Sequence, residues 1–180
     1  MPTRMNRKTE LAGRLALALA SLALVGAGAP SRVYRNEAMR VRAFEAPSGW
    51  EQAPQASYPR LLTSFAHADG GRLTLTAQKV PAGTTAATLV EQSRAALEKQ
   101  GFSAIHVTVD KERARLDALL DGGKRMARQA YVVDGGIGYV VTLIAPESAA
   151  APMTRDFEFA LHSLRLGGPE RTDSDGGVAR

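Results

Sequence analysis

The sequence predicts an α+β domain: a twisted, mostly antiparallel sheet of about six to seven strands, flanked by two main helices. Two observations support this prediction. Several short segments alternate apolar and polar residues and are joined by Asp-Gly-Gly turns, which is typical of antiparallel strands. Two other segments carry a single apolar stripe at helical spacing, as expected for helices that pack on a sheet.

Three strands are predicted before the first helix. Residues 40–46 (RVRAFEA) alternate in polarity and end at Pro47, and residues 61–67 form a short apolar segment. Residues 72–80 alternate again after an Asp-Gly-Gly turn, which predicts a hairpin with the segment before it.

The first helix is predicted over residues 85–100. Its end is marked by Gly101, which is suited to the left-handed residue after a helix, and by Phe102 as the apolar contact beyond it. Its apolar stripe consists of Ala86, Leu89, Val90, Ala96 and Leu97.

Four strands and a second helix follow. The run from Tyr139 to Ile144 is apolar on both faces, which indicates a central strand that is covered on both sides, at least in part. Pro152 suits the first position of a helix that runs to Ser163. The predicted strands are residues 103–110, 113–120, 125–133 and 138–145, and the stripe of the second helix is Met153, Phe157, Ala160, Leu161 and Leu164.

The two ends of the chain are predicted to lie outside this domain, which spans residues 40–166. Residues 1–27 have the basic start, short apolar run and small-residue exit of a secretory signal peptide. An uncleaved N-terminal anchor and a buried helix are the alternatives. Residues 28–39 are predicted to be a linker and 167–180 a disordered tail. We therefore expect an exported protein, either periplasmic or secreted.

Charge and cysteine content exclude several classes of function. The formal net charge is +5, but the first 30 residues carry four basic residues and one acidic residue, so 19 basic and 17 acidic residues remain beyond them. That near balance argues against a nucleic-acid partner. The chain has no cysteine, which excludes disulfides, thiolate catalysis and acylation of a lipoprotein cysteine.

The order of the elements and several of their core residues resemble the PsbP-like superfamily, which includes bacterial DcrB-like envelope proteins. The resemblance covers about residues 40–166 and implies a PsbP-like sandwich. It also implies that the domain binds another protein rather than turning over a substrate. No shared site motif is present, so the resemblance assigns no site residue. It is carried by Phe44-x-Ala-Pro-x-Gly-Trp50, Leu89-Val-Glu-Gln-Ser-Arg-Ala-Ala-Leu97, Lys99-Gln-Gly-Phe102, Gln129-x-Tyr131, Gly138-Tyr-Val-Val-Thr-Leu143, Phe157 and Ser163-Leu-Arg-Leu166.

No motif for chemistry is present. His67, His106 and His162 have none of the spacings of metal-binding helices, and no serine lies in a nucleophile elbow. We therefore predict no catalytic, metal-binding or cofactor-binding residue, no cofactor and no enzymatic activity.

Two groups of residues are candidates for an interaction surface. Trp50 and Tyr58 lie in a Pro-rich loop, where an aromatic side chain is either a binding anchor or a lid that folds back on the core. A basic stretch offers a docking face for an acidic partner or for anionic lipid headgroups, or else a solvated face with cross-strand ion pairs. Its residues are Lys111, Arg113, Arg115, Lys124, Arg125 and Arg128.

The leading functional prediction is thus a non-enzymatic domain that docks onto a protein partner in the cell envelope. The alternative is a small-molecule or lipid binder with a pocket between sheet and helix. Contact with a membrane is expected only through an uncleaved signal peptide or at the periphery. A pocket of several hundred Å³ would favour the alternative, since cavities of roughly that size hold small ligands.

Overall fold

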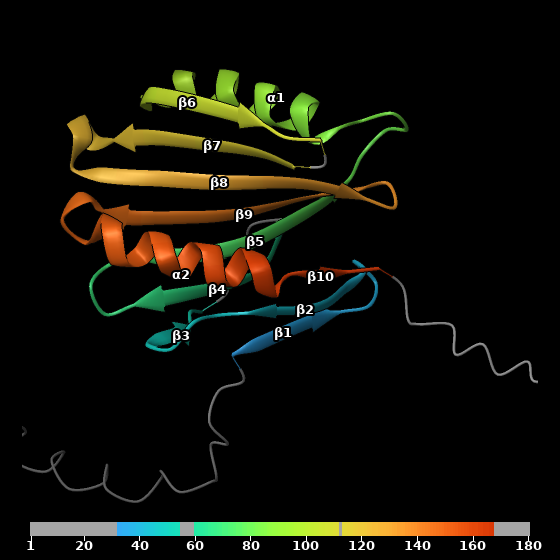
Figure 1. Ribbon diagram of the computed structural model, residues 1–180, viewed down its shortest axis with the longest axis horizontal. Helices are drawn as coiled ribbons and strands as arrows, with labels where there is room; N and C mark the ends of the chain where they lie inside the picture. Colours follow the sequence, from blue (N-terminus) through green and yellow to red (C-terminus); the bar gives the residue numbers. More distant parts are fainter. Residues whose placement is uncertain (1–31, 55–59, 112, 168–180) are drawn as a thin grey trace, which may run out of the picture. The chain divides into compact units, whose positions relative to one another are not determined.

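The computed structural model describes residues 32–54, 60–111 and 113–167. Within these ranges the chain forms ten strands, two α-helices and two short 3₁₀ helices (Figure 1). In chain order they are β1 (Val33–Asn36), β2 (Val41–Glu45), β3 (Trp50–Gln52), β4 (Leu61–His67), β5 (Arg72–Lys79), α1 (Ala86–Lys99), β6 (Ser103–Val109), β7 (Arg113–Leu120), η1 (Asp121–Gly123), β8 (Arg125–Asp134), β9 (Ile137–Pro146), η2 (Glu147–Ala149), α2 (Ala150–Ser163) and β10 (Arg165–Leu166).

Seven of the strands form one sheet in the order β3-β4-β5-β9-β8-β7-β6. Every neighbouring pair in it is antiparallel. A smaller sheet in the order β1-β2-β10 lies beside the first, next to α2 (Figure 1). The predicted α+β class, with a mostly antiparallel sheet and two main helices, is therefore confirmed.

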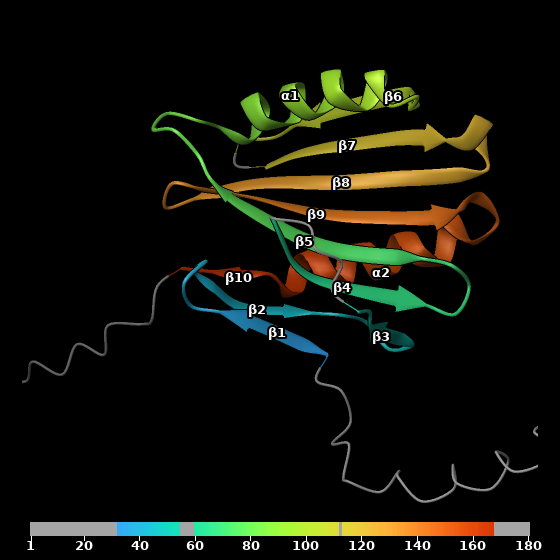
Figure 2. The same ribbon diagram turned by 180° about the vertical axis from the view of Figure 1, so that it is seen from behind.

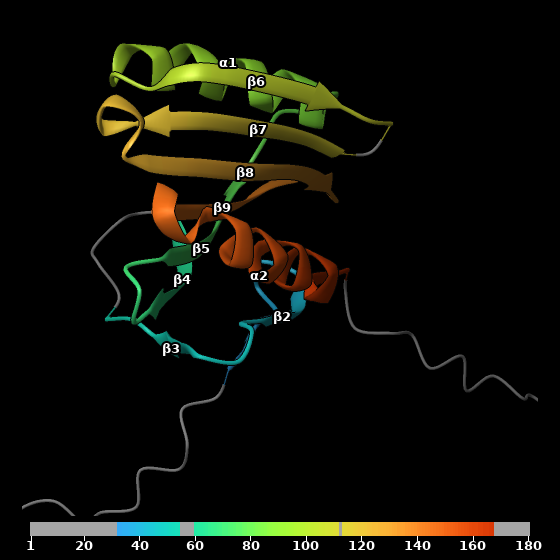
Figure 3. The same cartoon turned by 60° about the vertical axis from the view of Figure 1, so that its left-hand side comes forward.

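The two helices pack on opposite faces of the large sheet. Figure 3 shows α2 in front of the sheet and α1 behind β6 and β7. The strand register explains how one sheet serves both helices: Leu73 faces Leu143 on the α2 side, whereas Thr74 faces Thr142 on the other side. β9 lies in the middle of the sheet, as its doubly apolar sequence predicts.

Helix α1 lies within the predicted range and ends before the predicted Gly101. Thr85 is its N-cap, and its side-chain oxygen accepts a hydrogen bond from the backbone N–H of Thr88 at 3.2 Å. Gly101 follows the helix with a φ of 85°, and the N–H of Phe102 reaches back to the carbonyl of Leu97. The buried stripe is narrower than predicted, since Ala96 is exposed.

Helix α2 begins at Ala150, two residues before the predicted start at Pro152. Pro152 is tolerated inside the first turn because the first four N–H groups of a helix have no partner within it. The predicted stripe is confirmed: Met153, Phe157, Ala160 and Leu161 are buried, and Leu164 is partly buried against the same core.

Three short strands were not predicted. β1 lies within residues 28–39, so the expectation that this whole segment is a linker was wrong, and the domain begins before residue 40. β3 and β10 add strands beside β4 and β2. Gly167 donates a hydrogen bond to the carbonyl of Arg40 and so still belongs to the domain.

The predicted signal peptide and residues 168–180 of the predicted tail lie outside the described residues. Among the residues that the structure does describe, no helix combines the length and apolar character needed to cross a membrane.

Candidate functional site

One face of the large sheet is only partly covered by its helix. Figure 2 shows this face with α1 in front of the β6–β7 end, while no helix lies in front of β9, β5 and β4. The contacts of α1 agree with this partial coverage, because the helix packs on β6, β7 and β8. Half of the sheet face therefore meets α1 along one side, and no other helix of the described residues covers it.

A groove with a volume of about 520 Å³ lies along this uncovered half. Its floor comes from the three strands β5, β9 and β8, one side comes from α1, and the opposite side comes from β4 and the residue before it. The lining residues differ in chemistry from one side of the groove to the other. They are Thr74, Thr76, Thr142 and Gln129 on the floor, Leu89 and Ser93 on the α1 side, and Arg60, Leu61, Ser64 and Arg72 on the β4 side.

The alternation of β5 explains why the floor is polar. Leu73 and Leu75 are fully buried on the α2 side, so Thr74 and Thr76 must point to the other face. The antiparallel register then places Thr142 of β9 directly opposite Thr74. A row of hydroxyl groups thus lies in the middle of a sheet whose opposite face is apolar.

Polar side chains continue the row toward α1. Gln129 donates a hydrogen bond from Nε2 to Oγ1 of Thr142 at 3.3 Å. The phenol of Tyr131 donates in turn to Oε1 of Gln129. Burial raises the pKa of Tyr131 to about 12, against the opposing effect of a hydrogen bond with Ser93. The phenol therefore stays neutral near pH 7 and serves as a hydrogen-bonding group, not as a base.

Glycine at position 138 lets α1 approach the groove. A Cβ atom there would lie 2.7 Å from Cδ1 of Leu89 and 3.1 Å from Cγ1 of Val80. Because real Cβ atoms do not approach other atoms so closely, a side chain at Gly138 would force the end of the Leu89 side chain to move. Leu89 packs over this glycine at the apolar end of the groove.

The charged groups that line the groove are all of one sign. Arg60 and Arg72 are among its lining residues, and no described lining residue is acidic. Nε of Arg72 donates to Oγ of Ser64 at 3.1 Å, and Ser64 is only 2% exposed. The groove is therefore electropositive on the side opposite α1.

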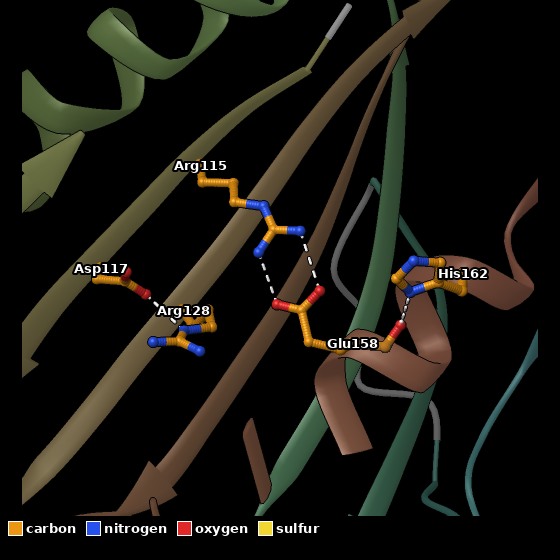
Figure 4. Close-up of polar contacts among 5 residues, drawn as sticks. All are labelled: Arg115, Asp117, Arg128, Glu158 and His162. Atoms are coloured by element: carbon orange, nitrogen blue, oxygen red, sulfur yellow. Dashed lines mark hydrogen bonds and ion pairs between the residues drawn. The ribbon is translucent and has the colours of Figure 1, made fainter. Parts of the chain in front are cut away.

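The basic stretch predicted from the sequence lies elsewhere, and its central members are paired. Arg115 makes two hydrogen bonds to the carboxylate of Glu158 on α2, at 2.6 and 2.9 Å (Figure 4). These contacts raise the pKa of Arg115 above its usual value. Arg128 donates from Nε to Asp117 of the neighbouring strand at 2.6 Å.

The remaining basic residues do not converge. Arg125 lies 3.8 Å from a carboxylate oxygen of Asp121. Lys111 and Arg113 are exposed at one end of β7, whereas Lys124 is exposed beyond its other end. The stretch therefore contains one cross-strand ion pair, between Arg128 and Asp117, and one ion pair to α2, and its exposed residues are separated by the length of a strand.

The aromatic candidates have different outcomes. Trp50 is 2% exposed, and its indole N–H donates to Oδ2 of Asp156 at 2.9 Å. Of the two interpretations, the burial of Trp50 favours a lid on the core, because a buried ring has little surface to offer a partner. Tyr58 lies outside the described residues.

The three histidines lie apart and have separate surroundings. His67 lies tilted against Trp50 with ring centroids 5.4 Å apart, His106 is exposed on β6, and His162 contacts the carbonyl of Glu158. Across the described ranges, no group of three or more histidine, aspartate or glutamate side chains is arranged to hold a metal ion.

Comparison with known proteins is informative at the level of structure. No protein-family model matches the sequence, and no curated protein matches it either. The solution structure of cyanobacterial PsbP (CyanoP) from Synechocystis sp. PCC 6803 matches with a TM-score of 0.58 and 15% identity, over 83% of this chain and 99% of that one. The chain has a PsbP-like fold. A crystal structure from Bacteroides thetaiotaomicron also matches, with a TM-score of 0.48 and 12% identity, over 76% of this chain and 48% of that one.

The resemblance inferred from the sequence is thus confirmed for the fold of this PsbP-like domain. The groove residues were not among the sequence candidates. Their signal in the sequence was the polar side of β5, with Thr74 and Thr76, and the single Thr142 within the apolar β9.

Proposed function

We propose that this PsbP-like domain is a binding protein rather than an enzyme, and that a small molecule or a lipid occupies the groove between α1 and the sheet. The observation that carries the proposal is the groove itself. Its volume of about 520 Å³ lies within the range of sites that hold small ligands. Of the two functions predicted from the sequence, the groove favours the small-molecule alternative. If the N-terminal segment is a signal peptide, this ligand is bound outside the cytoplasm.

The chemistry of the lining supports binding without turnover. The floor offers hydroxyl and amide groups, and the one ionisable group in its hydrogen-bonded row, Tyr131, is neutral near pH 7. Leu61, Leu89 and Val140 add apolar surface. Such a lining suits a ligand that is partly apolar and partly hydrogen-bonding.

Filling the groove is expected to abolish binding. In Thr76→Trp the indole would occupy the floor of the groove, so we expect the affinity for the probes octanol and octanoate to fall at least about tenfold. Calorimetric titration of the full-length protein measures both probes. Thr108→Trp is the matched control, because Thr108 is exposed on β6, outside the groove. The proposal fails if the wild type binds neither probe, or if both variants bind as the wild type does.

A second candidate function, docking of a protein partner, is favoured by strand β6. β6 is an edge of the seven-stranded sheet and, among the described strands, pairs only with β7, so the described part of the chain leaves the backbone groups of its outer side open to another strand. Its sequence, SAIHVTV, has no lysine, arginine, acidic residue or proline to discourage such pairing. Val109 at its end is 52% exposed. This candidate agrees with the protein binding implied by the resemblance.

A lysine on this edge is expected to prevent docking. In-cell crosslinking of tagged full-length protein, followed by mass spectrometry of the envelope fraction, would identify a partner. Val109→Lys should then reduce its yield severalfold, because a lysine on an edge strand opposes strand addition. Phe159→Lys is the control, since Phe159 is a similarly exposed apolar residue, at 48%, on α2. Unchanged crosslinking in Val109→Lys, or loss in Phe159→Lys alone, would exclude β6 as the docking edge.

A further inference from the structure

We infer that the ligand of the groove is an amphiphile with one acid group, a carboxylate or a phosphate, that binds at Arg72; this inference rests on the proposed function of the groove. The apolar part of such a ligand would lie toward α1. Three features of the described residues lead to this class of ligand.

The first feature is uncompensated charge. On the α2 face, the fold places a carboxylate against each central arginine: Glu158 lies 2.6 Å from Arg115, and Asp117 lies 2.6 Å from Arg128. In the groove, Arg60 and Arg72 have no carboxylate partner in the described part of the chain, and no described lining residue is acidic. Both arginines are exposed, so a bound anion can reach them and meets no competing carboxylate among the described lining residues.

The second feature is the way Arg72 is held. Ser64 is buried on β4, opposite Thr74 in the register, so its position is fixed by the sheet. Its hydroxyl accepts the hydrogen bond from Nε of Arg72. This single contact orients the guanidinium and leaves its two terminal nitrogens available. Two parallel N–H groups of this kind match the two oxygens of a carboxylate or of a phosphate.

Arg60 is not held in this way. The residue lies directly before β4, near Ala77, whose N–H donates to the carbonyl of Arg60 at 3.0 Å. Ala77 and Arg72 are five residues apart on β5, which corresponds to roughly 16 Å at the usual rise of a strand. The two arginines therefore lie toward different ends of the β4 side. Arg60 adds to the positive charge of the groove but does not bind the same acid group as Arg72.

The third feature is the contrast between the two sides of the groove. Arg72 lies on the β4 side, whereas α1 contributes Leu89 and the floor strand β9 contributes Val140; Leu61 adds apolar surface on the β4 side. Between them lie the hydroxyl groups of Thr74, Thr76 and Thr142. A ligand that reaches from Arg72 to Leu89 meets a cation at one end and an apolar side chain at the other, which is the pattern that an acidic amphiphile satisfies.

Calorimetric titration of the full-length protein with matched probes tests the inference. Octanoate and octyl phosphate are expected to bind about tenfold more tightly than octanol, because a hydrogen bond to a charged group adds at least that factor. Arg72→Gln should remove this preference and leave the affinity for octanol unchanged. Arg60→Gln should reduce the preference less. Arg155→Gln removes the same charge from an exposed position on α2 and should have no effect.

The outcomes separate this inference from the proposed function. If octanol binds as tightly as octanoate, or if Arg72→Gln keeps the preference, the acid site is wrong although the groove still binds amphiphiles. If inorganic phosphate alone binds as tightly as octyl phosphate, the ligand is a free anion and the amphiphile is wrong. If no eight-carbon probe binds, the proposed function of the groove itself is overturned.

Discussion

Replacing Phe157 with alanine is expected to lower the free energy of unfolding by about 3–5 kcal/mol. Phe157 lies on α2, and its ring is fully buried in the core that also contains Phe44 and Leu143. Because α2 packs on both β9 and β2, the space left by the ring lies between two sheets that are each held by their own hydrogen bonds. The residues around the cavity therefore move little to fill it. The free-energy cost of the cavity adds to the cost of losing the buried apolar ring. Urea denaturation followed by circular dichroism measures the change.

Phe159→Ala provides the matched control on the same helix. Phe159 is 48% exposed, so the same substitution two residues away is expected to change the free energy of unfolding by no more than about 0.5 kcal/mol. Equal losses in both variants would contradict the described packing of α2. So would an effect of Phe157→Ala below about 1 kcal/mol, since that is too small for a buried phenylalanine.

Phe157 also illustrates what the sequence reveals about this fold. The apolar stripe that includes Met153 and Phe157 repeats over several turns, and each turn adds to the same signal. The long strands are visible for the same reason, as in the alternation of β5. β1, β3 and β10 have four, three and two residues, which is too few for a period, and they become strands because a neighbour pairs with them.

The groove and the ion pairs depend on contacts that local patterns do not contain. The groove combines β4, β5, β9 and β8 with α1, and β5 and β9 are adjacent in the sheet although α1 and three strands separate them in sequence. Thr74 and Thr76 are predictable as the polar side of a strand, but not as the floor of a groove. Similarly, Glu158 neutralises Arg115 from 43 residues away, so the basic stretch looks unpaired in the sequence.

Replacing Trp50 with alanine is also expected to lower the free energy of unfolding by about 3–5 kcal/mol. The indole packs in the core that contains Phe65 and Met153. Its N–H donates to Asp156 at 2.9 Å, so the substitution also removes a link between β3 and α2. Because Trp50 is the single tryptophan, its fluorescence is lost in the variant, and unfolding is best followed by far-ultraviolet circular dichroism.

Trp50→Phe separates the hydrogen bond from the packing. It keeps most of the apolar ring but removes the N–H that Asp156 accepts, so we expect a smaller loss of about 1–2 kcal/mol. The order of stability should therefore be wild type, Trp50→Phe, then Trp50→Ala. If Trp50→Ala instead unfolds at the wild-type midpoint and loses a crosslinked partner, the ring is a binding anchor. The lid interpretation would then be wrong, because a side chain that contributes nothing to stability cannot be closing the core.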